Sequence, residues 1–427
     1  MMSPVLKHLA IFGGPRFIQR SFEKYNPMGW EEVEAARRVV ESGILSQYLG
    51  SWHDDFYGGP KVREFEKECA TYFGVKHAIT VNSWTSGLIC AVGAIGIEPG
   101  DEVIVSPWTM SASATAIVHW NAIPVFADIE SETFNLDPSS VERNITPQTK
   151  AIMAVDIFGH SADMDALMAI AKKHGLKVIS DTAQAPGAYY KGKYAGTLAH
   201  VGGYSLNYHK HIHTGEGGVL VTDDDEIAER LQLIRNHAEV VVADKGVTNI
   251  ANMVGYNFRL GEIECAIGIE QLKKLSGLVE RRQHVARLLT DGLSRLPGLR
   301  PPVVRQDCSH VYYAYPILLD MSVVQVSSEK LCSALRAEGV PVAWQYQNLH
   351  LLPMYQRKIA FGAKGFPWTS DVCKREVSYL KGICPVAEGL NETAYLSLNV
   401  SMFDYTDSDV DLLVEAFRKV WTCYGIE

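Results

Sequence analysis

The chain has 427 residues, of which 47% are hydrophobic and 21% are charged, and its formal net charge at pH 7 is −9. This composition is that of an ordinary globular protein, and the length exceeds what one small core can organise, so two domains are expected. The negative charge, without a basic cluster to offset it, argues against a nucleic-acid partner.

The first part of the chain changes from irregular to helical. Residues 1–29 carry glycine and proline turn signals and are expected to form an irregular arm. The pattern is helical from Trp30 to Ser42, where Gly43 ends it. After a loop rich in glycine and aromatic residues, apolar residues recur at spacings of three and four over Val62–Phe73, which predicts a second helix.

Short apolar runs then alternate with helical patterns such as Met164–His174. The runs are Ala78–Val81, Glu102–Ser106, Pro124–Ile129, Ala151–Phe158, Lys177–Asp181, Gly203–Leu206 and Gly218–Thr222. Strands this apolar are covered on both faces, which favours a mainly parallel sheet in an α/β domain. Ligands of such sheets bind at the carboxyl ends of the strands.

A helical segment from about Leu260 to Leu289 leads out of this domain. Beyond it, strand and helix patterns alternate at Val311–Leu319, Ser327–Glu338, Ala394–Val400 and Ser408–Trp421. These four elements predict a smaller α+β domain. The expected division is an N-terminal arm over 1–29, a large domain over 30–270 and a small C-terminal domain over 271–427.

Cysteine usage and hydropathy indicate the compartment. Eight cysteines are scattered along the chain without a C-x-x-C pair, which is typical of reduced thiols rather than of a disulfide framework or a zinc site. The N-terminus lacks the apolar core of a signal peptide, and the longest apolar stretch, 78–97, is interrupted by polar residues. We therefore expect a cytoplasmic protein without a membrane partner.

The stretch 202–218 places Lys210 among His209, His211 and His213, shortly before Gly-Glu-Gly-Gly. Burial disfavours the ammonium form of lysine and leaves an amine that can attack a carbonyl, as a Schiff-base lysine must. A solvated lysine beside a turn is an equally simple interpretation. The alternating histidines would share one face of a strand and could bind a metal, but no acidic or cysteine ligand lies at a useful spacing, so no metal is expected.

Two other strand ends carry polar groups. Asp181 follows a buried strand, where a carboxylate is costly unless it is paired, so a structural salt bridge is one interpretation. The segment 82–87, Asn-Ser-Trp-Thr-Ser-Gly, ends a strand and opens a helix whose amides could hold a phosphate. A phosphate-like turn, a strand-end aspartate and then Ser-x-x-x-x-Lys is the layout of a pyridoxal-phosphate enzyme, because the cofactor needs each part.

With these motifs, the sequence resembles the DegT/StrS-like family of sugar aminotransferases over nearly the whole chain. The most specific segments are Pro107–Ala116, Asp181–Gly187, Ser205–Gly218 and Gly255–Arg259. The resemblance implies fold type I of pyridoxal-phosphate enzymes, with a mainly parallel seven-stranded sheet flanked by helices and a smaller C-terminal α+β domain. It also implies pyridoxal 5'-phosphate (PLP) as cofactor and a homodimer with shared active sites.

The resemblance also assigns roles around the cofactor ring. Lys210 would bind the cofactor covalently, Asp181 would pair with its pyridine nitrogen, and Gln184 would contact its ring hydroxyl. Lys210 would then serve as the general acid and base that moves the proton between the substrate carbon and the cofactor.

The phosphate, by the same resemblance, would be held by the backbone at Trp84 and Thr85 together with the Ser205 hydroxyl. Asn257 would reach the phosphate of the neighbouring subunit's cofactor.

Three positions need comment against the family pattern. The family usually has glycine where Trp84 stands, so the phosphate turn must accommodate a large ring. It usually has an aromatic residue over the cofactor ring where Met110 stands; Met110 could cover the ring by a thioether contact, or Trp108 could shift in. His350 matches a family stretch near the substrate, although a core or surface histidine fits as well.

The implied reaction is the transfer of an amino group from glutamate or glutamine to a keto-sugar. A nucleotide-linked keto-sugar is the first candidate for this acceptor. A keto-cyclitol such as an inosose is the alternative acceptor. A pyridoxamine-dependent sugar dehydratase is a second alternative, but histidine replaces the lysine in that branch. A non-catalytic PLP-binding regulator would predict loss of Lys210 or Asp181, and both are present.

Overall fold

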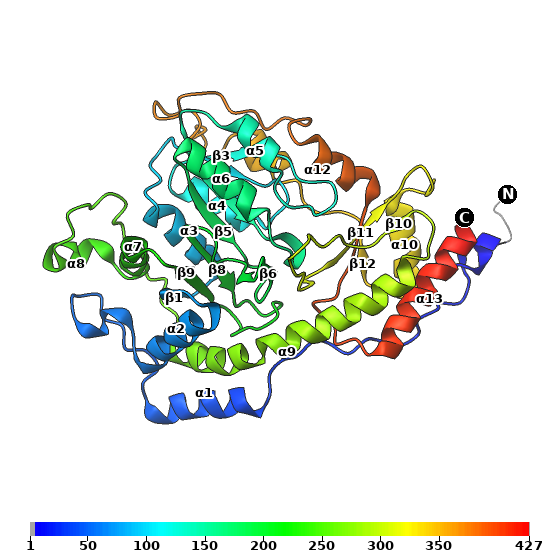
Figure 1. The fold of residues 1–427 in the computed structure, drawn as a ribbon, viewed down its shortest axis with the longest axis horizontal. Helices are drawn as coiled ribbons and strands as arrows, with labels where there is room; N and C mark the ends of the chain where they lie inside the picture. The colour runs from blue at the N-terminus through cyan, green and yellow to red at the C-terminus, as the bar shows by residue number, and fades with distance from the viewer. Residues whose placement is uncertain (1–4, 427) are drawn as a thin grey trace.

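The computed structural model of the chain describes residues 5–426; the first four residues of the predicted arm and the last residue of the predicted C-terminal domain lie outside the described part. Two main sheets are connected by the long helix α9 (Glu262–Leu293), which runs beneath both of them (Figure 1). One sheet has seven strands and the other has four.

The seven-stranded sheet has the order β1-β9-β8-β5-β4-β2-β3. Its strands are β1 (His77–Val81), β2 (Glu102–Val105), β3 (Ile123–Phe126), β4 (Thr149–Val155), β5 (Lys177–Asp181), β8 (Val201–Ser205) and β9 (Gly218–Thr222). The strands from β3 to β8 pair in parallel, whereas β9 is antiparallel to both β8 and β1. The predicted mainly parallel sheet is confirmed, with the ends of some strands shifted by a few residues.

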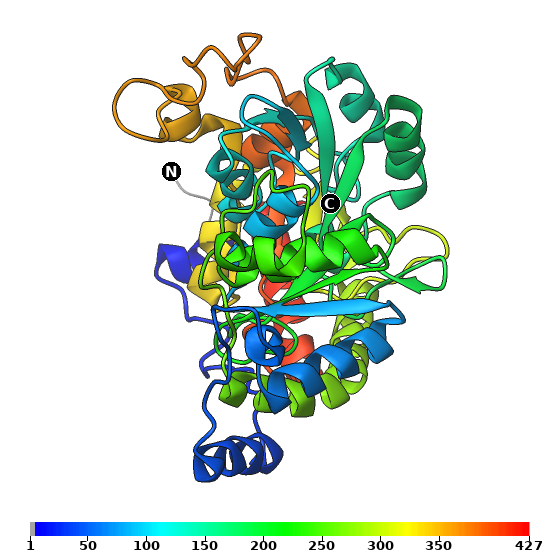
Figure 2. The same cartoon turned by 90° about the vertical axis from the view of Figure 1, so that its left-hand side faces the viewer.

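Helices cover both faces of this sheet (Figure 2). The helices of this part are α1 (Trp30–Ser42), α2 (Pro60–Phe73), α3 (Trp84–Ala94), α4 (Ser111–His119), α5 (Pro138–Asn144), α6 (Met164–His174), α7 (Asp225–Arg235) and α8 (Ala238–Lys245). Of these, α1 packs against α9 and not on the sheet (Figure 2). In β9, Leu220 packs in one hydrophobic core while Val219 and Val221 pack in another, because successive side chains of a strand point to opposite faces. Burial on both faces explains the unbroken apolar runs of the sequence.

The four-stranded sheet is antiparallel, with the order β10-β11-β13-β12. Its elements are β10 (Leu299–Arg300), β11 (Tyr315–Leu319), α10 (Ser328–Glu338), β12 (Val342–Ala343), β13 (Tyr395–Leu398) and α13 (Asp407–Tyr424). The core beneath this sheet includes the second half of α9, and Leu9 and Ile18 from the N-terminal arm. The predicted α+β character of the C-terminal part is confirmed.

Short elements complete the described chain. They are η1 (Val5–His8), η2 (Ala10–Phe12), η3 (Asp54–Tyr57), η4 (Ile157–Gly159), β6 (Tyr189–Tyr190), β7 (Lys193–Tyr194), η5 (Leu349–Leu351), α11 (Pro353–Gln356), α12 (Pro385–Gly389) and η6 (Leu390–Ala394). Because α9 continues unbroken through residue 270, the division into 1–29, 30–270 and 271–427 stays a prediction. Among the helices of residues 5–426, none is both long and apolar enough to cross a membrane.

The strand directions bring the predicted motifs to one edge of the large sheet. β5 and β8 are parallel neighbours, so Asp181 and Ser205 lie at the same edge. β9 runs back antiparallel to β8, and the loop 206–217 that joins them carries Lys210 at this edge. Helix α3 begins directly after β1.

Candidate active site

A cavity of about 260 Å³ opens at this edge of the sheet. Seven predicted site residues line it: Trp84, Thr85, Met110, Asp181, Gln184, Ser205 and Lys210. They come from segments that are far apart in the sequence, so the cavity exists only once the sheet has formed.

Lys210 is buried in the wall of this cavity. Its side chain is 7% exposed, and Nζ lies 4.3 Å from the centre of the Tyr313 ring. Burial lowers the pKa of Lys210 to about 8, although the negative charge of Asp181 raises it and the positive charge of Arg282 lowers it further. Near neutral pH the ammonium form still dominates, but the neutral amine is far more abundant than in an exposed lysine. The alternative of a solvated loop lysine is wrong, because the side chain is desolvated.

Asp181 faces the cavity from the end of β5 and is 4% exposed. Its Oδ1 accepts a hydrogen bond of 2.7 Å from the indole N–H of Trp84, and its Oδ2 accepts one of 2.6 Å from the Ser113 hydroxyl. Within residues 5–426 Asp181 forms no ion pair, so the structural salt bridge considered above is not its role. Its remaining lone pairs can accept a hydrogen bond from a protonated ring nitrogen.

The first turn of α3 supplies donors for an anion. The Ser83 hydroxyl caps this helix by accepting a 3.1 Å hydrogen bond from the Ser86 amide. The Trp84 and Thr85 amides are the first two N–H groups of the helix, and such groups have no partner within the helix. In the described chain neither amide has a hydrogen-bond acceptor. With the partial positive charge of the helix end and the nearby Ser205 hydroxyl, these amides fit an anion, and we call this group the phosphate cradle after the role that the resemblance implies.

Gln184 is held by the loop after β4. Its Oε1 accepts a 2.7 Å hydrogen bond from the Phe158 amide, and its Nε2 donates to the Tyr346 hydroxyl at 3.4 Å. The side-chain amide is therefore fixed in the cavity wall with donor capacity left for a hydroxyl or phenolate oxygen.

Met110 and Trp108 lie in different surroundings. Met110 lines the cavity and is 64% exposed. Trp108 is fully buried, and its indole N–H donates to Asn348 Oδ1 at 2.7 Å. Trp108 is thus held away from the cavity wall, and ring coverage by Met110 stays a prediction.

The three histidines do not share a strand face, because residues 206–217 form a loop. His209 lines the cavity beside Lys210, whereas His211 is fully buried and hydrogen-bonds the Val311 carbonyl at 2.7 Å. The backbone amide of His213 donates to Gln271. Residues 5–426 contain no group of three His, Cys, Asp or Glu side chains placed to hold a metal ion.

Two predicted residues lie outside this cavity. Asn257 is exposed, and its Oδ1 accepts a 2.7 Å hydrogen bond from Arg259. His350 is fully buried and pairs with Glu388 at 2.8 Å. The geometry gives no support to a substrate contact by His350, which fits the alternative of a core histidine.

Sequence reasoning did not single out Ser113, Tyr313 or Tyr346. Ser113 lies in the segment Pro107–Ala116, and its place in this segment was the only signal that the sequence offered. In the structure its hydroxyl lies 2.8 Å from the Thr109 hydroxyl. The two tyrosines come from loops of the C-terminal part and have no local motif that marks them. Their approach to Lys210 and Gln184 depends on how the two sheets pack together.

A buried lysine in the β8–β9 loop, a carboxylate at the end of β5 and an anion-binding helix start together define a pyridoxal-phosphate enzyme of fold type I. Residues 45–383 match the DegT/DnrJ/EryC1/StrS aminotransferase family. GDP-perosamine synthase of Caulobacter vibrioides is 38% identical, over 85% of this chain and 90% of its own. The chain belongs to this family and is a PLP-dependent aminotransferase, which confirms the resemblance seen in the sequence.

Further similarities extend over most of the chain. L-glutamine:scyllo-inosose aminotransferase of Streptomyces griseus is 34% identical, over 81% of this chain and 82% of its own. The structure of an aminotransferase from Psychrobacter cryohalolentis superposes with a TM-score of 0.79 at 27% identity, covering 95% of this chain and all of that one (100%).

The residues present fit PLP. The free amides of Trp84 and Thr85 match its phosphate, Asp181 matches its pyridine nitrogen, and Lys210 offers a desolvated amine. When bound, PLP supplies an electron sink for the charge that develops on the substrate carbon.

Proposed function

We propose that this aminotransferase carries an amino group from glutamate or glutamine to a keto-sugar that is linked to a nucleotide. Within the cofactor cavity, Lys210 Nζ would hold the proton that leaves the substrate carbon and return it after transfer. Asp181 would keep the proton on the pyridine nitrogen, and the first turn of α3 would bind the phosphate.

A second cavity supports an extended substrate. It has a volume of about 590 Å³ and shares His209, Tyr313 and Tyr346 with the cofactor cavity, so the two adjoin. A nucleotide-linked sugar needs such space beyond the reacting carbon, whereas a free cyclitol does not. This adjoining cavity is the observation that carries the proposal.

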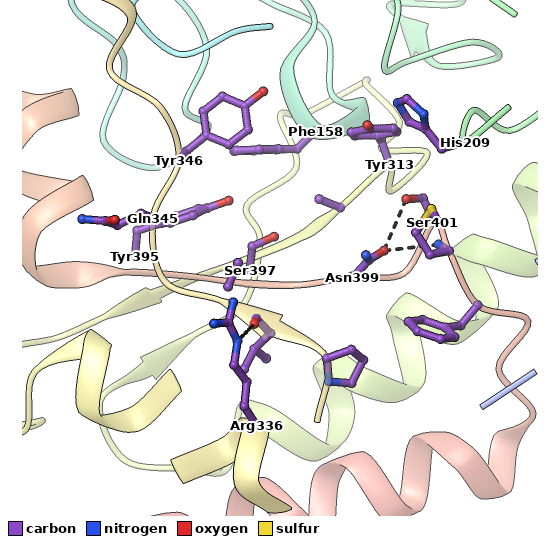
Figure 3. A pocket seen from close by; sticks show the side chains of 16 residues that line it. Phe158, His209, Tyr313, Arg336, Gln345, Tyr346, Tyr395, Ser397, Asn399 and Ser401 are labelled. Carbon is purple, nitrogen blue, oxygen red and sulfur yellow. Dashed lines mark hydrogen bonds between the residues drawn. The ribbon is translucent and has the colours of Figure 1, made fainter. Parts of the chain in front are cut away.

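The chemistry of the second cavity suits a sugar nucleotide (Figure 3). Aromatic side chains, among them Phe158 and Tyr346, stand on one side, and Arg336 stands on the opposite side. The Arg336 Nε donates to the Val342 carbonyl at 2.7 Å, and its guanidinium forms no ion pair within residues 5–426. Its free N–H groups can bind a phosphate while the aromatic wall contacts a sugar or base.

The same residues and the similar proteins bear on the alternative functions. Similarity to an L-glutamine:scyllo-inosose aminotransferase keeps the inosose as the second candidate acceptor. A pyridoxamine-dependent dehydratase is disfavoured by Lys210, which stands where that branch has histidine. A non-catalytic regulator is disfavoured because Lys210 and Asp181 are both present in one cavity.

The acceptor can be tested by offering the holoenzyme nucleotide-linked keto-sugars and inososes, each with glutamate or glutamine, and analysing the products by mass. We expect kcat/KM for a nucleotide-linked acceptor to be at least about tenfold higher, the factor that one charge-assisted hydrogen bond is worth. Arg336→Gln should remove most of this advantage. Arg300→Gln, at an exposed arginine outside the cavity, is the control. Equal or faster turnover of an inosose would favour the cyclitol instead.

We further propose a homodimer with shared sites. Trp30, Val33 and Val40 occupy one face of α1 at helical spacing and are 71%, 53% and 58% exposed. Exposed apolar faces of this kind are typical of protein interfaces. Asn257 is exposed and outside its own cavity, as a residue that completes a neighbour's site must be.

Mixing two inactive variants should test the shared sites. An Asn257→Ala subunit combined with a Lys210→Ala subunit forms hybrid dimers that keep one intact site. With random exchange, activity should recover to at most about a quarter of the wild-type value. The double variant mixed with Lys210→Ala should remain inactive. A fully active monomer would contradict the proposal.

We also propose a cytoplasmic location. All eight cysteines are free thiols in the structure, and Cys69, Cys90 and Cys265 are buried in its cores. Reduced, buried cysteines are the pattern of proteins folded in a reducing compartment.

A further inference from the structure

Trp84 occupies a position at which the resemblance leads one to expect glycine, and its side chain does not point into the phosphate cradle. The side chain is 5% exposed and turns inward against β8. A Cβ atom on Gly203 would lie 2.5 Å from Trp84 Cζ3, and one on Gly87 would lie 2.9 Å from Cε3. These two glycines leave the space that the indole fills, so the ring is tightly placed.

This placement brings the indole N–H to the carboxylate of Asp181. Trp84 Nε1 donates to Asp181 Oδ1 at 2.7 Å, while Ser113 donates to Oδ2. The Ser113 hydroxyl can rotate, and it also lies 2.8 Å from the Thr109 hydroxyl. The indole N–H has a fixed direction, and it can only donate. The Ala183 amide also donates to Oδ1, at the longer distance of 3.3 Å. Trp84 therefore gives the carboxylate its shortest donor of fixed direction and orients it toward the ring nitrogen.

We propose that Trp84 is a positioning residue, which acts through Asp181 to keep the proton on the cofactor's pyridine nitrogen. A donor to the carboxylate stabilises its ionised form. The proton shared between Asp181 and the ring nitrogen then stays on the nitrogen rather than moving to the carboxylate. The proposal concerns the cofactor and does not depend on which sugar is the acceptor.

The test uses holoenzyme loaded with PLP labelled with nitrogen-15 in the ring, because the chemical shift of this nitrogen reports its protonation directly. In the wild type we expect the shift of a protonated ring. In Trp84→Phe, which keeps an aromatic ring but lacks the N–H, the shift should move towards that of an unprotonated pyridine. The maximal rate of the half-reaction with the amino donor should fall on the order of ten- to a hundredfold.

Trp120→Phe is the matched control. Trp120 is 8% exposed, and its indole N–H donates to the Ile89 carbonyl, also at 2.7 Å, but it does not line the cavity. Its replacement removes an equivalent hydrogen bond and a similar volume. We expect it to lower stability as Trp84→Phe does, and to leave the ring-nitrogen shift and the half-reaction rate unchanged.

A second replacement covers the case in which Trp84→Phe does not fold. Exchanging the Trp84 indole for benzothiophene keeps the size and shape of the ring and replaces the N–H with sulfur. It should produce the same change in the nitrogen-15 shift. If neither replacement moves this shift further than Trp120→Phe does, the proposal is overturned and Trp84 only fills space. The shift is read without substrate, so failure of the proposed acceptor leaves this test intact.

Discussion

Lys210→Arg is expected to abolish transamination while leaving the fold and the cofactor cavity in place. Arginine keeps the positive charge, but its guanidinium does not lose its proton in proteins, so it can neither attack the cofactor nor move a proton. Loss of the proton transfer alone costs roughly 10²–10⁴-fold in rate. Borohydride reduction of the wild-type holoenzyme should fix the cofactor on Lys210, and the variant should carry no label.

The pH dependence of cofactor attachment gives a second measurement of the same group. Burial lowers the pKa of Lys210 to about 8. Below that pH the ammonium form dominates and cannot react, so attachment of PLP to the apoprotein should accelerate as pH rises and level off above about 8. Lys191→Arg, at an exposed lysine paired with Asp165, should behave as the wild type does. Label found on Lys191 or Lys193 would contradict the assignment.

The sequence predicted those parts of the fold and site that depend on local pattern. All seven strands of the large sheet follow from apolar runs, since strands buried on both faces need no polar alternation. Asp181 could be found because it ends the apolar run of β5, and the turn at Trp84 because it separates β1 from a helix; Lys210 could be found because it stands in a short glycine-rich motif between β8 and β9. The parallel pairing of β5 with β8 then places them at one edge.

Other features could not be predicted because they depend on contacts between distant segments. The reversal of β9 has no signal in its own five residues; it depends on how the helix-free loop 206–217 returns the chain to the side of β8. Tyr313 reaches Lys210 only because the C-terminal part packs against the large sheet. His350 is the opposite case: a family-like motif marks it in the sequence, but the fold buries it against Glu388, so its contact with the substrate stays a prediction.

The same distinction applies to Trp84. In the sequence, Trp84 stands where the family pattern has glycine, and the resemblance gives a role only to its backbone, in binding the phosphate. In the structure its side chain reaches 97 positions along the chain to Asp181. The cofactor-facing carboxylate is thus set by β5, α3 and α4 together, through Asp181, Trp84 and Ser113.

Asp181→Asn should separate the cofactor role of this carboxylate from a structural one. The asparagine can keep both hydrogen bonds, because its Oδ1 can accept from the Trp84 indole while its Nδ2 donates to the Ser113 hydroxyl, which can turn to accept. The variant should therefore fold and still attach PLP at Lys210. What it loses is the negative charge that holds the proton at the pyridine nitrogen.

This charge matters most when the substrate carbon loses its proton, because the protonated nitrogen then stabilises the developing negative charge more strongly than in the ground state. Removal of one preorganised electrostatic group of this kind lowers kcat by roughly 10²–10³-fold, which single-turnover kinetics can measure. The negative charge of Asp181 also raises the pKa of Lys210, so the pH profile of PLP attachment to the Asp181→Asn apoprotein should shift to lower pH. If the variant instead unfolds while its surviving fraction works at the normal rate and with an unshifted profile, Asp181 serves the fold and not the cofactor.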